Sequence, residues 1–203
     1  MPSPLTVVIC HGSYHTPEPY QPFLDALEQN EIEAYCPQLP TSDLSKLNVG
    51  DISKPNYDCS PPPGGFPQPA DDTEVIQNLL RRLVIEEEKN IILIGHSAGG
   101  FTATASATPE FQEKTRKQLG ASGGILGVFY ACAILAPVGE SINSFFQPKD
   151  GSPPTIPPYC QFHVRYMLLR LYILALGLIY TASPEALMVL ARQKTEQPIS
   201  SMA

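Results

Sequence analysis

The pentapeptide Gly-His-Ser-Ala-Gly at residues 95–99 constrains the fold more than any other feature of this sequence. It follows directly on the apolar run Ile91–Ile94, and small residues follow it in turn. A short apolar run closed by glycine predicts a buried strand. The two glycines leave room for a sharp strand-to-helix turn. Ser97 would then stand at the end of the strand, before a helix N-terminus that favours negative charge.

A serine presented in this way is typical of nucleophilic catalysis. Its hydroxyl is a weak nucleophile, so it also needs a nearby base and hydrogen-bond donors for the oxyanion. The bare Gly-x-Ser-x-Gly pattern is common by chance, but the strand before it and the small residues after it favour the catalytic interpretation. We therefore predict Ser97 as the nucleophile, with Gly95 and Gly99 as the glycines of the turn. His96 is expected to point away and pack.

Strands and helices alternate along the first two thirds of the chain, which predicts a parallel sheet. Asp72 is expected to cap the helix that precedes the central strand. Between residues 37 and 69, proline, glycine and serine accumulate, and we expect an irregular surface excursion of the kind that often overhangs a site. The expected strands are Leu5–Cys10, Ala34–Cys36, Ile91–Ile94 and part of Ile125–Leu135, and the expected helices are Phe23–Asn30, Asp72–Leu83 and Phe101–Ala107.

Composition and charge exclude some classes of partner. The 203 residues carry a formal net charge of -7 and no basic run longer than Arg81-Arg82, so we expect no nucleic-acid binding. The five cysteines are scattered and form no CxxC pair, which favours a reduced compartment and no metal. No basic region precedes the first apolar run, so we expect no secretion signal and a cytoplasmic location.

The most apolar segment, residues 166–182, is interrupted by Arg170 and Gly177. A membrane-spanning helix needs about 20 consecutive, mostly apolar residues, and this segment falls short. We predict a buried or cap helix here, with membrane attachment through residues 166–182 as the less favoured alternative. A last helix is expected over Pro184–Lys194.

Three stretches carry a resemblance to a known family: Val7–Ser13, Tyr35–Pro40 and Ile94–Gly100. Together they resemble the small cap-bearing α/β hydrolases related to methyl-ester esterases and hydroxynitrile lyases. The resemblance covers about the first 145 residues and returns weakly at Pro184–Gln193. It implies an α/β-hydrolase-like three-layer sandwich with a mostly parallel sheet, C-terminally shortened. Residues 1–145 would form the core, and residues 146–203 a partial helical cap.

The resemblance also implies roles for residues near the predicted nucleophile. The backbone N–H groups of Ser13 and Ala98 would form the oxyanion hole. Tyr14 and His15 would border the substrate pocket, although exposed loop residues without a role are an equally good interpretation. The implied partner is a small-molecule ester-like substrate, and no cofactor is required.

In this family the acid and the histidine of the triad follow the serine, and this sequence has no matching positions for them. A shortened polypeptide is one explanation. Another is a rebuilt site in which His163 is the base and Glu140 the acid, although both residues are more readily interpreted as structural. A third is a binding or interaction protein without catalysis, and a lyase on the same fold is a further alternative. A sheet without its last strands would expose an apolar edge, so self-association is expected.

Overall fold

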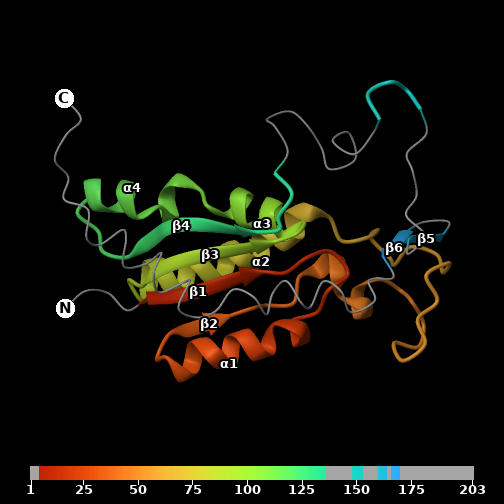
Figure 1. Ribbon diagram of the computed structural model, residues 1–203, viewed down its shortest axis with the longest axis horizontal. Coiled ribbons are helices and arrows are strands. Elements are labelled where there is room, and N and C mark those ends of the chain that lie inside the picture. The colour runs from red at the N-terminus through yellow and green to blue at the C-terminus, as the bar shows by residue number, and fades with distance from the viewer. Residues whose placement is uncertain (1–4, 136–147, 153–159, 164–165, 170–203) are drawn as a thin grey trace.

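The computed structural model describes residues 5–135, 148–152, 160–163 and 166–169. Its centre is a four-stranded parallel sheet in the order β2-β1-β3-β4 (Figure 1). The sheet begins with the central strand β1, and the chain then adds β2 on one side and β3 and β4 on the other. These strands are β1 (Leu5–Cys10), β2 (Glu33–Tyr35), β3 (Asn90–His96) and β4 (Gly124–Ala131).

The register of the strands brings their carboxyl ends to the same edge of the sheet. Cys10, near the end of β1, lies opposite Gly95 of β3, and Gly95 lies opposite Tyr130 of β4. In open α/β sheets, ligands bind in the crevice outside this edge. The residues that follow β1, β3 and β4 are therefore neighbours although they lie far apart in the sequence.

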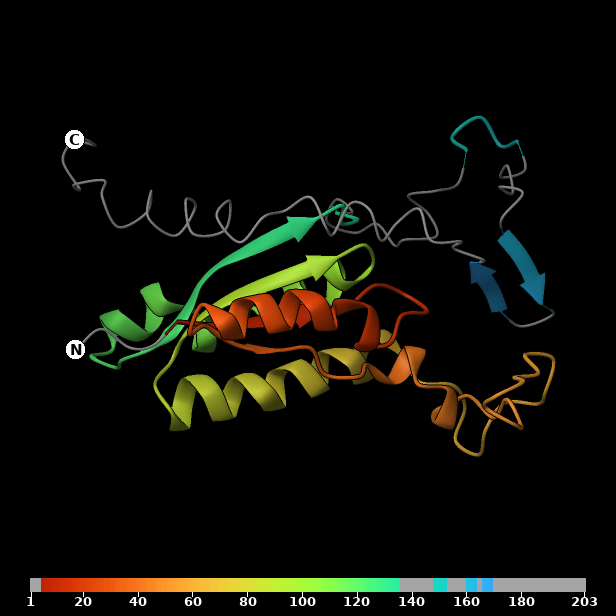
Figure 2. The same cartoon turned by 60° about the horizontal axis from the view of Figure 1, so that its bottom comes forward.

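Helices cover both faces of the sheet, which is why β1 is apolar except for Thr6 (Figure 2). Val7 and Ile9 point to one face, where they pack with Leu27 of α1. Val8 and Cys10 point to the other face, where the core includes buried residues of α2 and α3. The helices are α1 (Gln21–Gln29), α2 (Pro69–Leu80), which continues as a π-helical turn over Arg81–Glu86, α3 (Gly99–Ser106) and α4 (Glu113–Gln118).

The four expected strands and the helices after residues 23, 72 and 101 are present, with boundaries shifted by a few residues. The role of Asp72 was predicted wrongly. Helix α2 begins at Pro69, and Gln68 and Asp71 form its capping box. Asp72 lies inside the helix instead, where its carboxylate accepts hydrogen bonds from the N–H of Thr41 at 2.9 Å and the hydroxyl of Thr41 at 2.6 Å. Its acidic side chain serves a contact across the fold rather than the helix end.

The expected excursion between β2 and α2 contains only two short 3₁₀ turns, Pro40–Ser42 and Leu44–Lys46. Its distal part forms a groove of about 540 Å³, and Asp71 of α2 also lines it. None of the predicted site residues lines this groove. The nearer residues 39–42 contact the site directly, as shown below.

Beyond β4, the described residues include the antiparallel strands β5 (Cys160–His163) and β6 (Tyr166–Leu169). The first four residues of the segment 166–182 therefore lie in a strand and not in the expected helix. Residues 170–182, the helix expected over 184–194, the boundary at 145/146 and Glu140 lie outside the described residues. Within the described part of the chain, no helix has both the length and the apolar character needed to cross a bilayer.

Candidate active site

Ser97 sits in the strand-to-helix turn between β3 and α3 with a left-handed backbone conformation, φ +53°. This conformation is costly for a residue other than glycine, so the surrounding contacts must enforce it. The Ser97 N–H donates to the carbonyl of Ala131 at 3.3 Å. The Ser97 carbonyl accepts from the N–H groups of Gly100 at 3.1 Å and Ile134 at 3.0 Å. The turn is thus fixed both by its own helix and by the chain that leaves β4.

The glycines of the turn are required by close backbone approach. A Cβ atom on Gly99 would lie 2.0 Å from the carbonyl oxygen of Cys10, and a Cβ on Gly95 would lie 2.6 Å from the Cα of Gly100. Both contacts are with backbone, which cannot rotate away as a side chain can. Helix α3 therefore starts directly against the end of β1, and this packing aims Ser97 out of the sheet edge.

The loop after β1 comes to the same place. A Cβ on Gly12 would lie 3.1 Å from the Cβ of Ser97, so this loop contacts the turn at Gly12. The Gly12 N–H donates to the hydroxyl of Tyr20, and the Tyr14 N–H donates to the hydroxyl of Ser42, each at 3.0 Å. Ser13 lies between these two anchored amides.

The two backbone N–H groups predicted for the oxyanion hole differ from their neighbours. Within the described residues, the N–H groups of Ser13 and Ala98 donate to no acceptor, whereas the N–H groups of Gly12 and Tyr14 are both engaged. Ser13 is exposed and Ala98 is half-buried. Both amides are therefore available to a ligand oxygen.

Three histidines and Tyr20 form a largely buried polar cluster behind the loop. The Tyr20 hydroxyl lies 2.8 Å from Nδ1 of His15 and 2.7 Å from Nδ1 of His96. The rings of His15 and His96 stack with centroids 5.5 Å apart. His96 therefore packs inward as expected, but it also makes a polar contact that the sequence did not indicate.

Burial keeps the histidines of this cluster neutral. It lowers the pKa of His96 to about 4, with smaller contributions from the nearby His15 and His11. Burial also lowers the pKa of His15 and of His11 and raises the pKa of the Tyr20 hydroxyl. At neutral pH the cluster carries no charge.

His11 holds the beginning of the excursion against the loop. Its Nε2 accepts the N–H of Leu39 at 3.0 Å, so Nδ1 carries the proton and donates to the carbonyl of Gly12 at 3.0 Å. Thr41 is anchored to Asp72, and Ser42 accepts from Tyr14. The excursion thus fixes the loop through backbone groups on either side of Ser13.

The structure brings several of the predicted site residues together. Gly12 lies close to Ser97, which places Ser13 of the same loop near the turn that carries Ala98. His15 joins this group through Tyr20, while Tyr14 is 42% exposed with φ +64°. His163 ends strand β5, and its side chain is not among those described; Glu140 lies outside the described residues.

Tyr20, Ser42 and Asp72 are the contributors that sequence reasoning missed. Tyr20 follows two prolines in an unremarkable stretch, and the hydroxyl of Ser42 gave no signal among the many serines of the excursion. Their contacts span between 5 and 76 residues.

The described residues contain no group of three or more histidine, cysteine, aspartate or glutamate side chains that could hold a metal ion. Cys10, Cys36, Cys59 and Cys132 are free thiols. Burial raises the pKa of Cys36 to about 12, so this thiol stays protonated. The chemistry available near the turn is that of the serine hydroxyl, the backbone amides and the neutral imidazoles.

A parallel sheet covered by helices on both faces, with a strained serine in a glycine-flanked turn after a central strand, is the architecture of the α/β hydrolases. The chain belongs to the alpha/beta hydrolase family, whose model matches residues 7–194. The fold class predicted from the sequence is confirmed.

Among curated proteins, the chain is similar to the alpha/beta hydrolase nvfD of Aspergillus novofumigatus (strain IBT 16806), with 27% identity over 144 residues. The match covers 70% of this chain and 48% of nvfD, so the chain spans about half the length of this relative.

Two solved structures are also similar. One is an extracellular alpha/beta-hydrolase from a Paenibacillus species, described as sharing homology with tobacco salicylic acid binding protein 2, with 20% identity and a TM-score of 0.44. The match covers 72% of this chain and 48% of that one. The other is a variant of PytH, with 17% identity and a TM-score of 0.45, which covers 81% of this chain and 55% of PytH.

Proposed function

We propose that this protein is a serine hydrolase that uses Ser97 to cleave an ester or another activated acyl group of a small organic molecule. The observation that carries the proposal is the turn itself. Ser97 is held at φ +53° beside the Gly12 loop, and the amides of Ser13 and Ala98 are both without an acceptor in the described part of the chain. Membership of the alpha/beta hydrolase family supports it.

In the proposed reaction, Oγ of Ser97 attacks the acyl carbonyl while its proton passes to a histidine base. The carbonyl oxygen becomes an oxyanion that accepts hydrogen bonds from the N–H groups of Ser13 and Ala98. The alkoxide leaves with the proton from the base. Water then attacks the acyl-enzyme and releases the carboxylic acid, and Ser97 regains its proton.

The base and its acid remain predictions. We keep His163 and Glu140 as the candidates, since the histidines of the buried cluster are engaged elsewhere: Nδ1 of His15 and of His96 contacts Tyr20, and both ring nitrogens of His11 have partners. The substrate would enter beside Tyr14, which is exposed, and His15, which is half-buried. Their rings favour an apolar or aromatic acyl compound.

The test is a panel of small esters, lactones and cyanohydrins, assayed with the wild type, Ser97→Ala and His163→Ala. Ser122→Ala is the matched control, because it makes the same chemical change at an exposed serine. Release of acid from an ester or lactone that disappears in Ser97→Ala and persists in Ser122→Ala supports the proposal. Cleavage of cyanohydrins alone, again dependent on Ser97, contradicts hydrolysis and favours a lyase. Folded protein that converts no compound favours a binding protein.

A further inference from the structure

We propose that Tyr20 is a positioning residue of this site: its hydroxyl, shared between His15 and His96, holds the amide of Gly12 and thereby aims the amide of Ser13 at the substrate. The proposal rests on the hydrolase function above, because it concerns the donor of the oxyanion hole. It assigns a role to three residues, Tyr20, His15 and His96, that lie outside the expected triad.

The hydrogen-bond geometry around the Tyr20 hydroxyl leaves little freedom. Its oxygen has three polar partners: the Gly12 N–H at 3.0 Å, Nδ1 of His15 at 2.8 Å and Nδ1 of His96 at 2.7 Å. The amide of Gly12 can only donate. The hydroxyl has one hydrogen to give, so it donates to one imidazole and accepts from Gly12 and from the other imidazole.

Because the Tyr20 hydroxyl has a single hydrogen, the two neutral imidazoles must be opposite tautomers. The ring that accepts the Tyr20 hydrogen has a bare Nδ1 and carries its proton on Nε2. The ring that donates to Tyr20 carries its proton on Nδ1. A hydrogen bond from the Gly12 N–H to the Tyr20 hydroxyl, made together with both imidazole contacts, therefore implies one imidazole of each kind. The tautomers can be measured without any substrate.

Tyr20 with His15 and His96 forms a hydrogen-bonded hub. This hub joins the loop after β1 to the turn that carries Ser97, and catalysis requires these two segments to keep their relative position. Tyr20 precedes α1, Gly12 is in the loop after β1, and His96 is the residue before Ser97. A Cβ on Gly12 would lie 3.1 Å from Ser97 and 3.3 Å from Nδ1 of His96, so the loop has almost no room to approach further. With Gly12 anchored to Tyr20 and Tyr14 anchored to Ser42, the peptide of Ser13 is held from both sides.

The hydrogen bond from the Gly12 N–H to Tyr20 depends on the protonation of His15 and His96. If both Nδ1 atoms were protonated, the Tyr20 oxygen would face three donors and its own hydrogen would have no acceptor, so the Gly12 amide would be released. The titratable groups around the cluster are His11, Cys36 and Asp72. The carboxylate of Asp72 raises the pKa of His11, but burial lowers this pKa by more. The environment therefore keeps the hub in its anchoring form at neutral pH.

Nitrogen NMR of the histidine rings in the full chain tests the hub directly. The expected result is that, near neutral pH, one of His15 and His96 carries its proton on Nδ1 and the other on Nε2. The Gly12 amide should exchange slowly with solvent, and its exchange should speed up by about tenfold or more in Tyr20→Phe, since the amide loses its acceptor. Two Nε2–H rings, or a Gly12 amide indifferent to Tyr20→Phe, would overturn the proposal.

The functional half is tested by the rate at which a fluorophosphonate labels Ser97. Tyr20→Phe should slow labelling by about tenfold, less than the roughly 10²–10³ lost when an oxyanion donor is removed outright. The matched control is Tyr35→Phe, which removes a hydroxyl that donates to Glu33 at the edge strand and should change the rate by less than about twofold.

The two proposals fail in different ways. A wild type that is folded but not labelled would refute the hydrolase function, and the ring tautomers and the Gly12 exchange would still decide whether the hub exists. Normal labelling of folded Tyr20→Phe, with opposite tautomers in the wild type, would refute the positioning role alone. Thermal unfolding of each variant shows whether a slower rate reflects loss of fold.

Discussion

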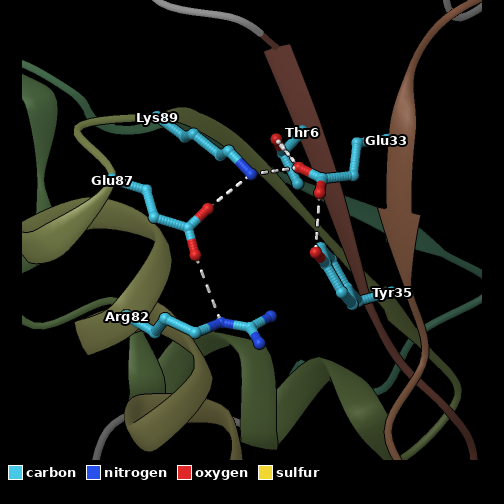
Figure 3. A network of polar contacts seen from close by, with 6 residues as sticks. All are labelled: Thr6, Glu33, Tyr35, Arg82, Glu87 and Lys89. Carbon is cyan, nitrogen blue, oxygen red and sulfur yellow. Dashed lines mark hydrogen bonds and ion pairs between the residues drawn. The ribbon is translucent and has the colours of Figure 1, made fainter.

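The two ends of strands β1 and β3 carry polar networks of opposite kinds. At the carboxyl end, Tyr20 and the histidines form a largely buried, uncharged cluster beside Ser97. At the amino end, Lys89 bridges Glu33 at 2.6 Å and Glu87 at 2.5 Å in a charged, solvent-facing network (Figure 3). The buried cluster restricts the protonation state of its histidines and the position of the loop after β1. The charged network joins the edge strand β2 to the start of β3.

The charged network follows from where the chain enters each strand. Glu33 begins β2 and Lys89 directly precedes β3, so their side chains meet across β1, where Thr6 also donates to Glu33 at 3.0 Å (Figure 3). Burial alone would raise the pKa of Glu33. Hydrogen bonds from Lys89, Tyr35 and Thr6 lower it by more, so the pKa lies below its ordinary value. Because water screens such pairs, they contribute modestly to stability. We therefore expect the polar contacts of the buried end to constrain the fold more than those of the exposed end.

The largest effect on stability is expected from Gly99→Ala. The new Cβ would lie 2.0 Å from the carbonyl oxygen of Cys10 and 2.5 Å from that of His11, so β1 and α3 must move apart. We expect a loss of about 3 kcal/mol or more, or failure to fold. Urea denaturation measures it. The control is Ala105→Val, on the exposed face of the same helix, which should lower the free energy of unfolding by roughly 0.5 kcal/mol. Equal losses of stability for both changes would contradict the close packing of Gly99 against β1.

The next effect is on the pH dependence of stability. The pKa of His96 is about 4 in the folded protein and 6.5 in its ordinary state, so the unfolded chain binds more protons between these values. Stability is therefore full above about pH 6.5 and falls as the pH drops towards 4, by on the order of 3 kcal/mol. Denaturation midpoints across this window should show the fall.

The variant His96→Asn separates the two networks. It removes the imidazole that resists protonation, so the fall between pH 6.5 and 4 should become shallower. Glu33→Gln removes a group whose lowered pKa contributes stability that is lost only as the pH falls through and below its ordinary value of 4.5. If the loss of stability near pH 6 disappeared in Glu33→Gln and persisted in His96→Asn, the charged network and not the buried cluster would cause it. That result would contradict the expectation.

A smaller effect is expected from Asp72→Ala. Thr41 loses both acceptors of its N–H and hydroxyl groups, which lie 2.9 and 2.6 Å from the carboxylate. We expect a cost of about 2 kcal/mol, since hydrogen bonds to charged groups contribute roughly 1.5–3 kcal/mol. Thermal denaturation measures it. Asp71→Ala, which removes the N-terminal capping contact of the same helix, should cost about 1 kcal/mol; a larger loss at Asp71 would mean that Asp72 stabilises little.

The smallest effect is expected at the charged end. Lys89→Met should lower stability by about 0.5–1 kcal/mol, because it breaks two screened ion pairs while the aliphatic part of the side chain still packs. The difference from the wild type should shrink in high salt. A salt-independent cost of several kcal/mol would show that this network is as constraining as the buried cluster.

The parts of the fold that the sequence predicts are those with a local signal. Strands β1 and β3 are mostly apolar runs that lead into glycine, and the turn at Ser97 follows from glycine spacing. Helix α4 was not foreseen because residues 109–120 are mostly polar, and Phe111 of the preceding 3₁₀ turn is the one apolar residue buried there, beside the buried Arg116.

The contacts that complete the site have no such signal. Aspartate is a common helix-capping residue, but the hydrogen-bond partner of Asp72 is Thr41, 31 residues away. Tyr20 reaches His96 across 76 residues. Such long-range contacts depend on how the elements pack in three dimensions, which a single sequence does not encode in any short pattern.

The role of Ser97 as nucleophile is tested by labelling of the purified full chain with a fluorophosphonate, followed by mapping of the modified peptide. We expect rapid labelling on Ser97 that is lost in Ser97→Ala and retained in Ser122→Ala. Folded protein that is not labelled, or that is labelled elsewhere, would contradict the claim that the turn after β3 presents an activated nucleophile.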